Sequence, residues 1–196
     1  IMVLPGTYSV QLSKSINGEV TVLSEPVEFE VKTLNNRTLP ATDPEEMLAY
    51  HKELTKLSKS ANSARSAFNE LNDRLEYYQA AARIVSSANL TSMINGMEDS
   101  LEEIQLAMFG NRIKNQLEIN QAPSLTSRIN TAINTGMSSG SDPTETSKMV
   151  KQIAESQLKP VVDSLKGIMN DAIPAIDAEL DRLGAPWTPG RIIDLD

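Results

Sequence analysis

Five consecutive residues match the motif that presents the nucleophile of many serine hydrolases. Gly136-Met137-Ser138-Ser139-Gly140 has the spacing G-x-S-x-G, which in those enzymes forms a sharp turn after a β-strand and exposes the serine. Here the motif follows a helical pattern, and the single histidine, His51, precedes the serine instead of following it. We therefore interpret residues 136–140 as an interhelical loop, and the sequence predicts no catalytic residue and no enzymatic activity.

A lone histidine and one group of carboxylates are the candidates for metal binding. His51 has neither a cysteine nor a Glu-x-x-His partner to complete a zinc or di-iron site, and we interpret it as a partly exposed structural residue near the base of a bundle. Two i,i+4 acidic pairs lie on one predicted helix: Glu98, Asp99, Glu102 and Glu103. No EF-hand loop accompanies them, so a solvated helix face explains them. The sequence predicts no metal site and no cofactor.

Other patterns can be explained either by binding or by chance and core packing. Asn36-Arg37-Thr38 and Asn89-Leu90-Thr91 fit the N-glycosylation sequon, which is a frequent chance match. Aromatic and methionine side chains form a possible contact surface for a glycan or a peptide: Tyr77, Tyr78, Trp187, Met93, Met97 and Met108. Their burial between helices would instead make them core residues.

The composition excludes several classes of protein. The chain has 196 residues, of which 40% are hydrophobic, no cysteine, and a formal net charge of −8. The aliphatic content is too high for a disordered chain, a disulfide scaffold needs cysteines, and an acidic chain is a poor ligand for nucleic acid. No apolar run is long enough to span a membrane. We expect one or two domains, with no nucleic-acid partner and no membrane span.

The first 34 residues have the period of β-strands. Apolar and polar residues alternate over residues 7–14 and again over 27–31, where Pro26 marks the entry. Asn17-Gly18 predicts a turn into a short strand around Val20 and Val22. Three strands do not bury a core alone, so residues 1–34 either pack on helices or end a larger β-sandwich. We favour the sandwich.

A long helix is predicted after the strands. Asp43-Pro44-Glu45-Glu46 combines an acceptor at the N-cap, a proline at the first helical position and a glutamate at the third. An unbroken heptad pattern follows: Met47, Tyr50, Leu54, Leu57, Ala61, Ala64, Phe68, Leu71, Leu75, Tyr78, Ala82 and Val85. Residues 43–87 therefore form one helix of roughly 65 Å.

Three further helices are expected. The second contains Leu90, Ile94, Met97, Leu101, Ile104 and Met108 and ends at Gly110-Asn111, and residues 111–123 stay ambiguous. Ser124 caps a third, short helix that ends near Met137. Asp142-Pro143-Thr144-Glu145 starts a fourth that runs to Leu183. Pro160 and Pro174 lie on its outer face, where we expect kinks, with a break at Pro160 as the alternative.

These elements predict a mainly α fold: a long antiparallel four-helix bundle or coiled-coil rod over residues 43–184, with two long and two short helices. The short β-hairpin segment 1–34 precedes it. With short loops, the first helix should run away from that segment, the second return part way, the third turn outward and the fourth come all the way back. Near that segment the first and fourth helices alone should then form a two-stranded coil. The tail, residues 185–196, is expected to dock back on the base of the bundle beside the strands.

Two parts of the sequence resemble known proteins. Leu4-Pro5-Gly6-Thr7-Tyr8-Ser9-Val10 and Pro26-Val27-Glu28-Phe29-Glu30-Val31 resemble the last hairpin of an immunoglobulin-like β-sandwich in bacterial exported proteins. The helical part is similar to the C-terminal region of sortilin-like or BNR-repeat β-propeller proteins, which are often labelled glycosyl hydrolases. This similarity extends from Asp43-Pro44 through Asp142-Pro143 to the closing Leu180-Asp181-Arg182-Leu183-Gly184. This resemblance implies a propeller upstream and a periplasmic, cell-surface or extracellular location. No Asp-box residue of such a propeller occurs in this chain.

Two functions follow as hypotheses. The first is a non-enzymatic C-terminal structural and interaction module, which acts as a spacer, a docking element or a self-association element of a larger exported protein. Its partners would be upstream domains of the same polypeptide or a second copy of the chain. The alternative is an accessory module that binds a glycan or a peptide through the exposed aromatic residues.

Overall fold

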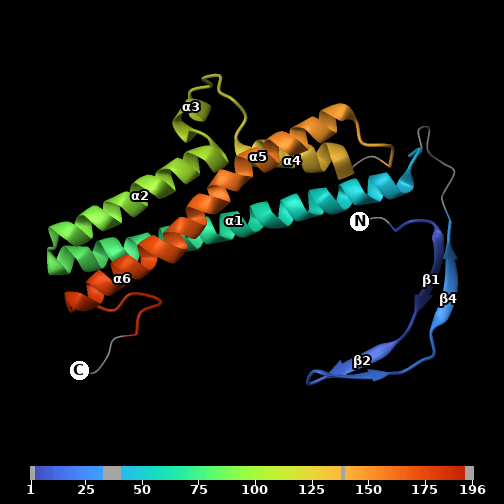
Figure 1. The fold of residues 1–196 in the computed structure, drawn as a ribbon, viewed down its shortest axis with the longest axis horizontal. Coiled ribbons are helices and arrows are strands. Elements are labelled where there is room, and N and C mark those ends of the chain that lie inside the picture. The colour runs from blue at the N-terminus through green and yellow to red at the C-terminus, as the bar shows by residue number, and fades with distance from the viewer. Residues whose placement is uncertain (1–2, 33–40, 138–139, 193–196) are drawn as a thin grey trace.

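The computed structural model describes residues 3–32, 41–137 and 140–192. It is mainly helical, with a small β region at the N-terminal end, as predicted (Figure 1). The strands are β1 (Gly6–Val10), β2 (Ser13–Ile16), β3 (Glu19–Val22) and β4 (Val27–Val31). The helices are α1 (Pro44–Val85), α2 (Ala88–Phe109), α3 (Arg112–Gln116), α4 (Leu125–Met137), α5 (Glu145–Gly167) and α6 (Ile173–Arg182), with a π-helical segment, Ile168–Ala172, between the last two.

The four strands form one long bent hairpin, which we call the arm (residues 3–32). β1 pairs antiparallel with β4, and β2 pairs antiparallel with β3. Asn17 and Gly18 have φ values of 51° and 87°, which confirms the predicted turn. The predicted strand 7–14 is divided into β1 and β2, because one residue on that side, Gln11, faces three, residues 24–26, on the other. The pairing cannot stay continuous across this bulge.

The capping residues and the apolar stripe of the sequence predict the start and the buried face of α1 correctly. The Asp43 side chain accepts hydrogen bonds from the amides of Glu45 and Glu46 at 2.9 and 3.1 Å, and Pro44 is the first helical residue. The helix ends where Ser86 adopts a left-handed conformation. Nine of the predicted stripe residues are buried: Met47, Tyr50, Leu54, Leu57, Ala64, Phe68, Leu71, Leu75 and Tyr78. Ala61, Ala82 and Val85 are half-buried and pack against them.

Within the described residues, the helices form three rods, of which the first and third run in the same direction and the second is antiparallel to both, so the expected four-helix bundle is not confirmed. α1 runs away from the arm, and α2 returns along its far half (Figure 1). α4 then continues in the direction of α2 along the near half of α1, where its Gly136 lies against Leu54 and Tyr50. The third rod, α5 to α6, runs outward again. We expected the third helix to turn outward and the fourth to return, and both directions are wrong. The expected two-stranded coil near the arm is wrong for the same reason, because α4 packs there against the first turns of α1.

The third rod passes both of its internal prolines without ending. α5 includes Pro160 as an α-helical residue, so the alternative of a break there is wrong. Pro174 follows the π-helical segment, where the amide of Ile173 donates to the carbonyl of Ile168, five residues earlier. The wider π turn accommodates a proline ring that would clash in a regular α-helix. The rod begins at Glu145 with Thr144 as its N-cap, two residues later than Asp142 predicted.

Asp142 joins the starts of two rods instead of capping one. Its carboxylate accepts hydrogen bonds from the amide of Thr42 at 2.9 and 3.0 Å and from the amide of Asp43 at 3.4 Å. These amides lie just before α1. The start of α5 is therefore fixed to the start of α1 at the end of the bundle that carries the arm.

The tail packs at the end of the bundle opposite to the arm, not beside the strands (Figure 1). Arg191 is buried, and its guanidinium donates to Asp181 Oδ1 at 2.6 and 2.9 Å and to the carbonyl of Pro186 at 3.0 Å. Gly190 lies over the guanidinium of Arg74 on α1. Because the third rod runs outward, the tail starts at the far end and docks there. Residues 193–196 lie outside the described residues.

Candidate functional site

The serine-hydrolase motif begins in a helix that is pressed against α1. A Cβ atom at Gly136 would collide with Leu54 Cδ1 and approach Tyr50 Cε1 to 2.9 Å, so glycine is needed for close packing. The His51 Nε2 atom lies 3.0 Å from the carbonyl oxygen of Gly136. Because a carbonyl only accepts, Nε2 carries the proton in this bond. Ser138 and Ser139 lie outside the described residues.

His51 is buried, with 3% of its surface exposed, so the expectation of a partly exposed residue is wrong. Its burial follows from the direction of α4, whose last turn covers the first turns of α1. The imidazole therefore links two rods through a backbone carbonyl. Sequence spacing did not predict this contact, because the partners are 85 residues apart.

The carboxylates on α2 do not converge on a common point. Within the described ranges, no group of three or more His, Cys, Asp or Glu side chains is close enough to hold a metal ion. Asp99, Glu102 and Glu103 are exposed, and Glu98 is half-buried. Glu103 differs from the others in its surroundings, because it lines a groove described below.

The aromatic residues are divided between core and surface. Tyr78 is fully buried, whereas Tyr77 and Trp187 are exposed. The Trp187 indole Nε1 donates to the carbonyl of Arg191 at 2.8 Å, which fixes the ring in the tail. Met97 and Met108 are core residues. Of the two sequons, Asn89 donates its side-chain amide to Glu179 Oε1 at 3.1 Å, and Asn36 lies outside the described residues.

A polar network that sequence reasoning missed joins α1 to α6. The Tyr78 hydroxyl donates to Asp177 Oδ1 at 2.6 Å, and Arg74 forms an ion pair with Asp177 Oδ2 at 2.9 Å. Burial, followed by the hydrogen bond to Asp177, raises the pKa of Tyr78 above its ordinary value. The network holds the first and third rods together and is structural. Its sequence signal is the hydroxyl that Tyr78 brings to a mostly apolar stripe, a signal that Tyr50 shares.

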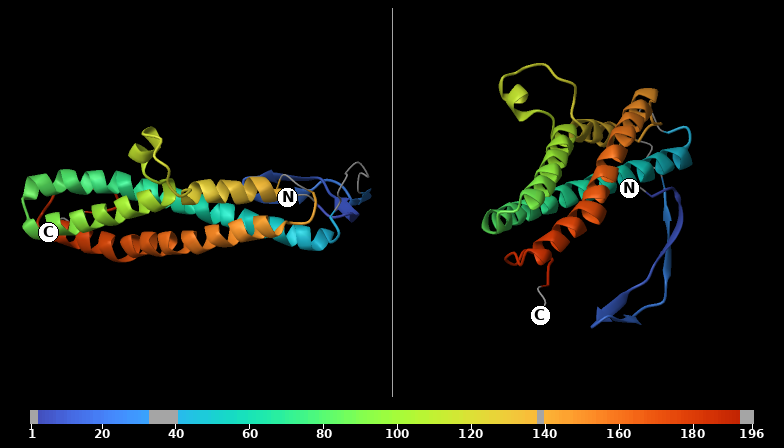
Figure 2. Two further views of the ribbon diagram at one scale, coloured as in Figure 1. Left: turned by 90° about the horizontal axis from the view of Figure 1, so that it is seen from above. Right: turned by 60° about the vertical axis from the view of Figure 1, so that its left-hand side comes forward.

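The arm exposes a continuous apolar surface, which we call the arm face: Tyr8, Val10, Val27 and Phe29. Cross-strand pairing places Tyr8 opposite Phe29 and Val10 opposite Val27, so all four lie on one side of the β1–β4 sheet. Val10, Phe29 and Val27 are 59%, 48% and 62% exposed. Figure 2 shows the arm standing away from the rods. Within the described residues, each strand pairs on one edge and leaves its other edge free.

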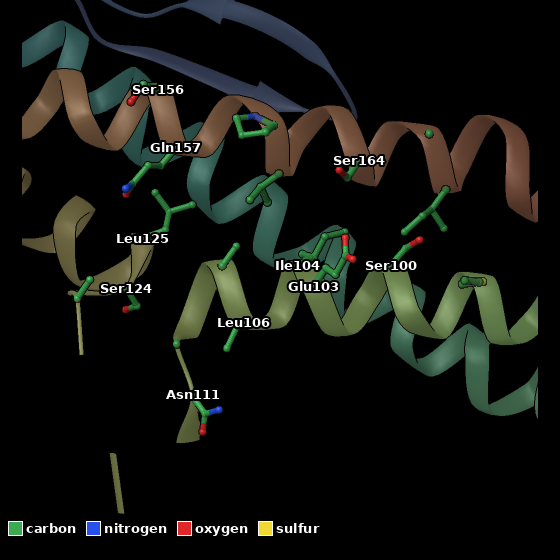
Figure 3. A pocket seen from close by; sticks show the side chains of 18 of the residues that line it. Ser100, Glu103, Ile104, Leu106, Asn111, Ser124, Leu125, Ser156, Gln157 and Ser164 are labelled. Carbon is green, nitrogen blue, oxygen red and sulfur yellow. The ribbon is translucent and has the colours of Figure 1, made fainter. Parts of the chain in front are cut away.

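A groove of about 1120 Å³ lies between α2 and α5, and we call it the α2–α5 groove. Figure 3 shows Ser100 and Glu103 on α2 facing Ser164 on α5. Gly96, Gly167 and Asp171 also line it. The face of α5 that carries Pro160 was expected on the outside of a bundle, whereas it forms one wall of this groove.

Comparison of the chain with protein-family models, curated proteins and solved structures finds no match. Among the described helices, none is both long and apolar enough to cross a membrane. The resemblance to exported β-propeller proteins and the immunoglobulin-like character of the arm stay predictions. The arm face and the α2–α5 groove are the surfaces from which a function can be argued.

Proposed function

We propose that the chain is a non-enzymatic structural and interaction module, in which the bundle acts as a spacer and the arm docks on another β-sheet domain. The observation that carries this proposal is the exposure of the arm face on a two-stranded sheet. An isolated two-stranded hairpin is marginally stable in water, and a further strand or a second layer stabilises it. A docked domain would bury the arm face and pair the free edges.

A β-sandwich is the kind of partner that fits the arm. The side of the β1–β4 sheet opposite to the arm face carries Thr7, Ser9, Glu28 and Glu30, which suits contact with water. In a β-sandwich, two sheets pack their apolar faces about 10 Å apart and expose polar residues outward. We expect the partner to be an upstream domain of the same polypeptide. By the resemblance of residues 4–10 and 26–31, that polypeptide would be exported to the periplasm, the cell surface or the exterior.

The bundle supports a spacer role through its length and its closed core. α1 has 42 residues, which gives a rod of about 63 Å. Its ends are held by side-chain contacts between rods: Asp142 with Thr42 near the arm, and Arg74 with Asp177 at the far end. Such a rod keeps its two ends at a fixed separation.

Amide hydrogen exchange of residues 6–31 tests the docking of the arm. We expect rapid exchange of the β1 and β4 amides in this chain alone and strong protection in the complete gene product. Val27→Ser should remove that protection, whereas Ile84→Ser, which changes an exposed residue on α1, should not. Equal exchange of the arm in both polypeptides would contradict the proposal.

A second candidate function is recognition of a glycan or a peptide. The exposure of Trp187 and Tyr77 favours it, because glycans and peptides stack on exposed aromatic rings. Trp187 is the sole tryptophan of the chain, so its fluorescence reports contact at the tail directly. A saturable change on titration with an oligosaccharide, lost in Trp187→Ala, would support this function, and constant fluorescence would oppose it.

A further inference from the structure

Two glycines leave the α2–α5 groove open. Gly96 lies within α2, and Gly167 lies within the continuous third rod. Apart from neighbouring residues and the backbone of its own helix, a Cβ atom added at either position would meet no atom within 4 Å. Glycine destabilises the interior of a helix relative to alanine, and packing inside this chain requires neither glycine. The space beside them is free for another molecule.

The segment after α2 exposes apolar side chains, and we call it the knob (residues 112–119). All of its residues are exposed, including Ile113, Leu117 and Ile119, which are 66%, 64% and 50% exposed. Ile113 and Leu117 are four residues apart across α3, so they lie on one side of it. Figure 2 shows α3 projecting away from the rods.

The charges of the knob and the groove are complementary. Glu103 and Asp171 line the groove, and no lysine or arginine is among its lining residues. The knob carries Arg112 and Lys114 against one carboxylate, Glu118. Among the described residues, none of the two acids of the groove and the two bases of the knob forms an ion pair. Docking would pair the opposite charges at the surface.

We infer that the knob of one copy of this chain docks in the α2–α5 groove of a second copy. The groove follows α2 from Gly96 to Gly110, a length of about 21 Å, which exceeds the single helical turn of α3. The knob is attached at one end of its own groove, near Gly110 and Ser124, and it projects outward, so the groove of a second molecule is the accessible one. We expect weak, reversible association, because the knob is a single short segment. The inference does not depend on docking of the arm.

Sedimentation equilibrium of the whole chain over a range of about 10 μM to about 1 mM tests this association. We expect reversible self-association of the unmodified chain. Ile113→Glu should weaken it by about tenfold or more, because a carboxylate would enter an apolar and acidic groove. Ile84→Glu is the matched control, since Ile84 is 69% exposed on the last turn of α1, and it should leave the association unchanged.

A second pair of variants tests the groove. Gly167→Phe fills the open space without a clash at Cβ and should abolish association. Gly167→Ala changes the helix propensity in the same direction without filling the groove, and it should associate like the unmodified chain. Circular dichroism and the melting temperature establish that each variant is folded. If Ile113→Glu does not fold, Leu117→Glu takes its place. If Gly167→Phe does not fold, Gly96→Phe takes its place.

A mixing experiment gives the decisive result. Ile113→Glu keeps an intact groove, and Gly167→Phe keeps an intact knob, so an equal mixture should form dimers at concentrations where Ile113→Glu alone associates at least about tenfold more weakly than the unmodified chain and Gly167→Phe alone does not associate. A strictly monomeric unmodified chain would overturn the inference. Association that survives both variants would assign the contact to another surface, such as the arm face, and a mixture that stays monomeric would exclude knob-in-groove docking.

Discussion

In α2, the six apolar side chains at three- and four-residue spacing are each 3% exposed or less. In the arm, Val10, Val20 and Val27 alternate with polar residues as regularly, yet 59–66% of the surface of each is exposed. Both regions follow a hydrophobic period that marks one face for burial. The bundle supplies the covering surface from its own rods, whereas no described residue covers the arm face.

The difference teaches that periodicity identifies a face and not its partner. A helix that pairs with other helices of the same chain completes its core on folding. A two-stranded sheet exposes half of its backbone edges and needs another sheet, strand or helix for stability. The bundle should therefore behave as an independent folding unit, and the arm should contribute little to its stability.

Truncation of a core side chain should show the largest contrast between the two regions. Leu101→Ala removes a side chain that is almost fully buried in α2, and we expect a loss of about 3 kcal/mol in the free energy of unfolding. Val27→Ala in the arm should change it by less than about 0.5 kcal/mol. Urea unfolding followed by circular dichroism measures both. Similar losses for the two variants would mean that the arm is packed against the bundle.

Adding a methyl group should divide the glycines of the bundle into two kinds. Gly136→Ala places Cβ against Leu54 and Tyr50, and we expect overpacking to destabilise the chain by about 1–3 kcal/mol. Gly96→Ala, which meets no atom within 4 Å, should stabilise it by about 0.5–1 kcal/mol. Melting temperatures that move in the same direction would contradict this division.

Disruption of the polar network between α1 and α6 should cause an intermediate loss in the free energy of unfolding. Asp177→Asn weakens the ion pair with Arg74 and the hydrogen bond from Tyr78. Because the Arg74 and Asp177 side chains are partly exposed, we expect a loss of about 1–2 kcal/mol, less than for a fully buried pair. A double-mutant cycle with Arg74→Met checks the interaction, and strictly additive losses would show that the two residues do not interact.

Acid should have the smallest effect, through the surface carboxylates of the bundle. Hydrogen bonds from Arg182 and Asn89 lower the pKa of Glu179 from 4.5 to about 2. The folded pKa lies below the unfolded one, so the stabilisation is present above about pH 4.5 and is lost as the pH falls toward 2. Hydrogen bonds from Thr42 lower the pKa of Asp142 in the same sense. Glu179→Gln should flatten the lower part of a plot of melting temperature against pH, and an unchanged slope would contradict this assignment.

Much of the helical part was predictable, because its signals are local. The Asp43 cap, the stop at Gly110 and all six buried residues of α2 are confirmed. The direction of α4 was not predictable, because the 15 residues from Gly110 to Ser124 allow either a turn or a continuation. The predicted position of the tail was wrong for the same reason, since it depends on the direction of the last rod.

The features of the candidate surfaces were harder to predict. Asp142 lies 99 residues from Asp43, and Tyr78 lies 99 residues from Asp177, so no periodic pattern connects them. Gly96 and Gly167 interrupt helical patterns, and only the arrangement of the rods shows that both line one groove. The exposure of the arm face depends on which surface lies beside it. The alternation of apolar and polar residues in a strand carries no information about that surface.

The carboxylate of Asp142 has a mechanical consequence. A pull on the arm reaches the bundle through the backbone before α1, where Asp142 accepts hydrogen bonds from Thr42 and Asp43. Tension applied there is divided between α1 and the start of the third rod, which run in the same direction (Figure 1). Because both helices are held together at the same end, they share a force that is applied to the arm. At this end α1 cannot be drawn away from the third rod until the hydrogen bonds of Asp142 break.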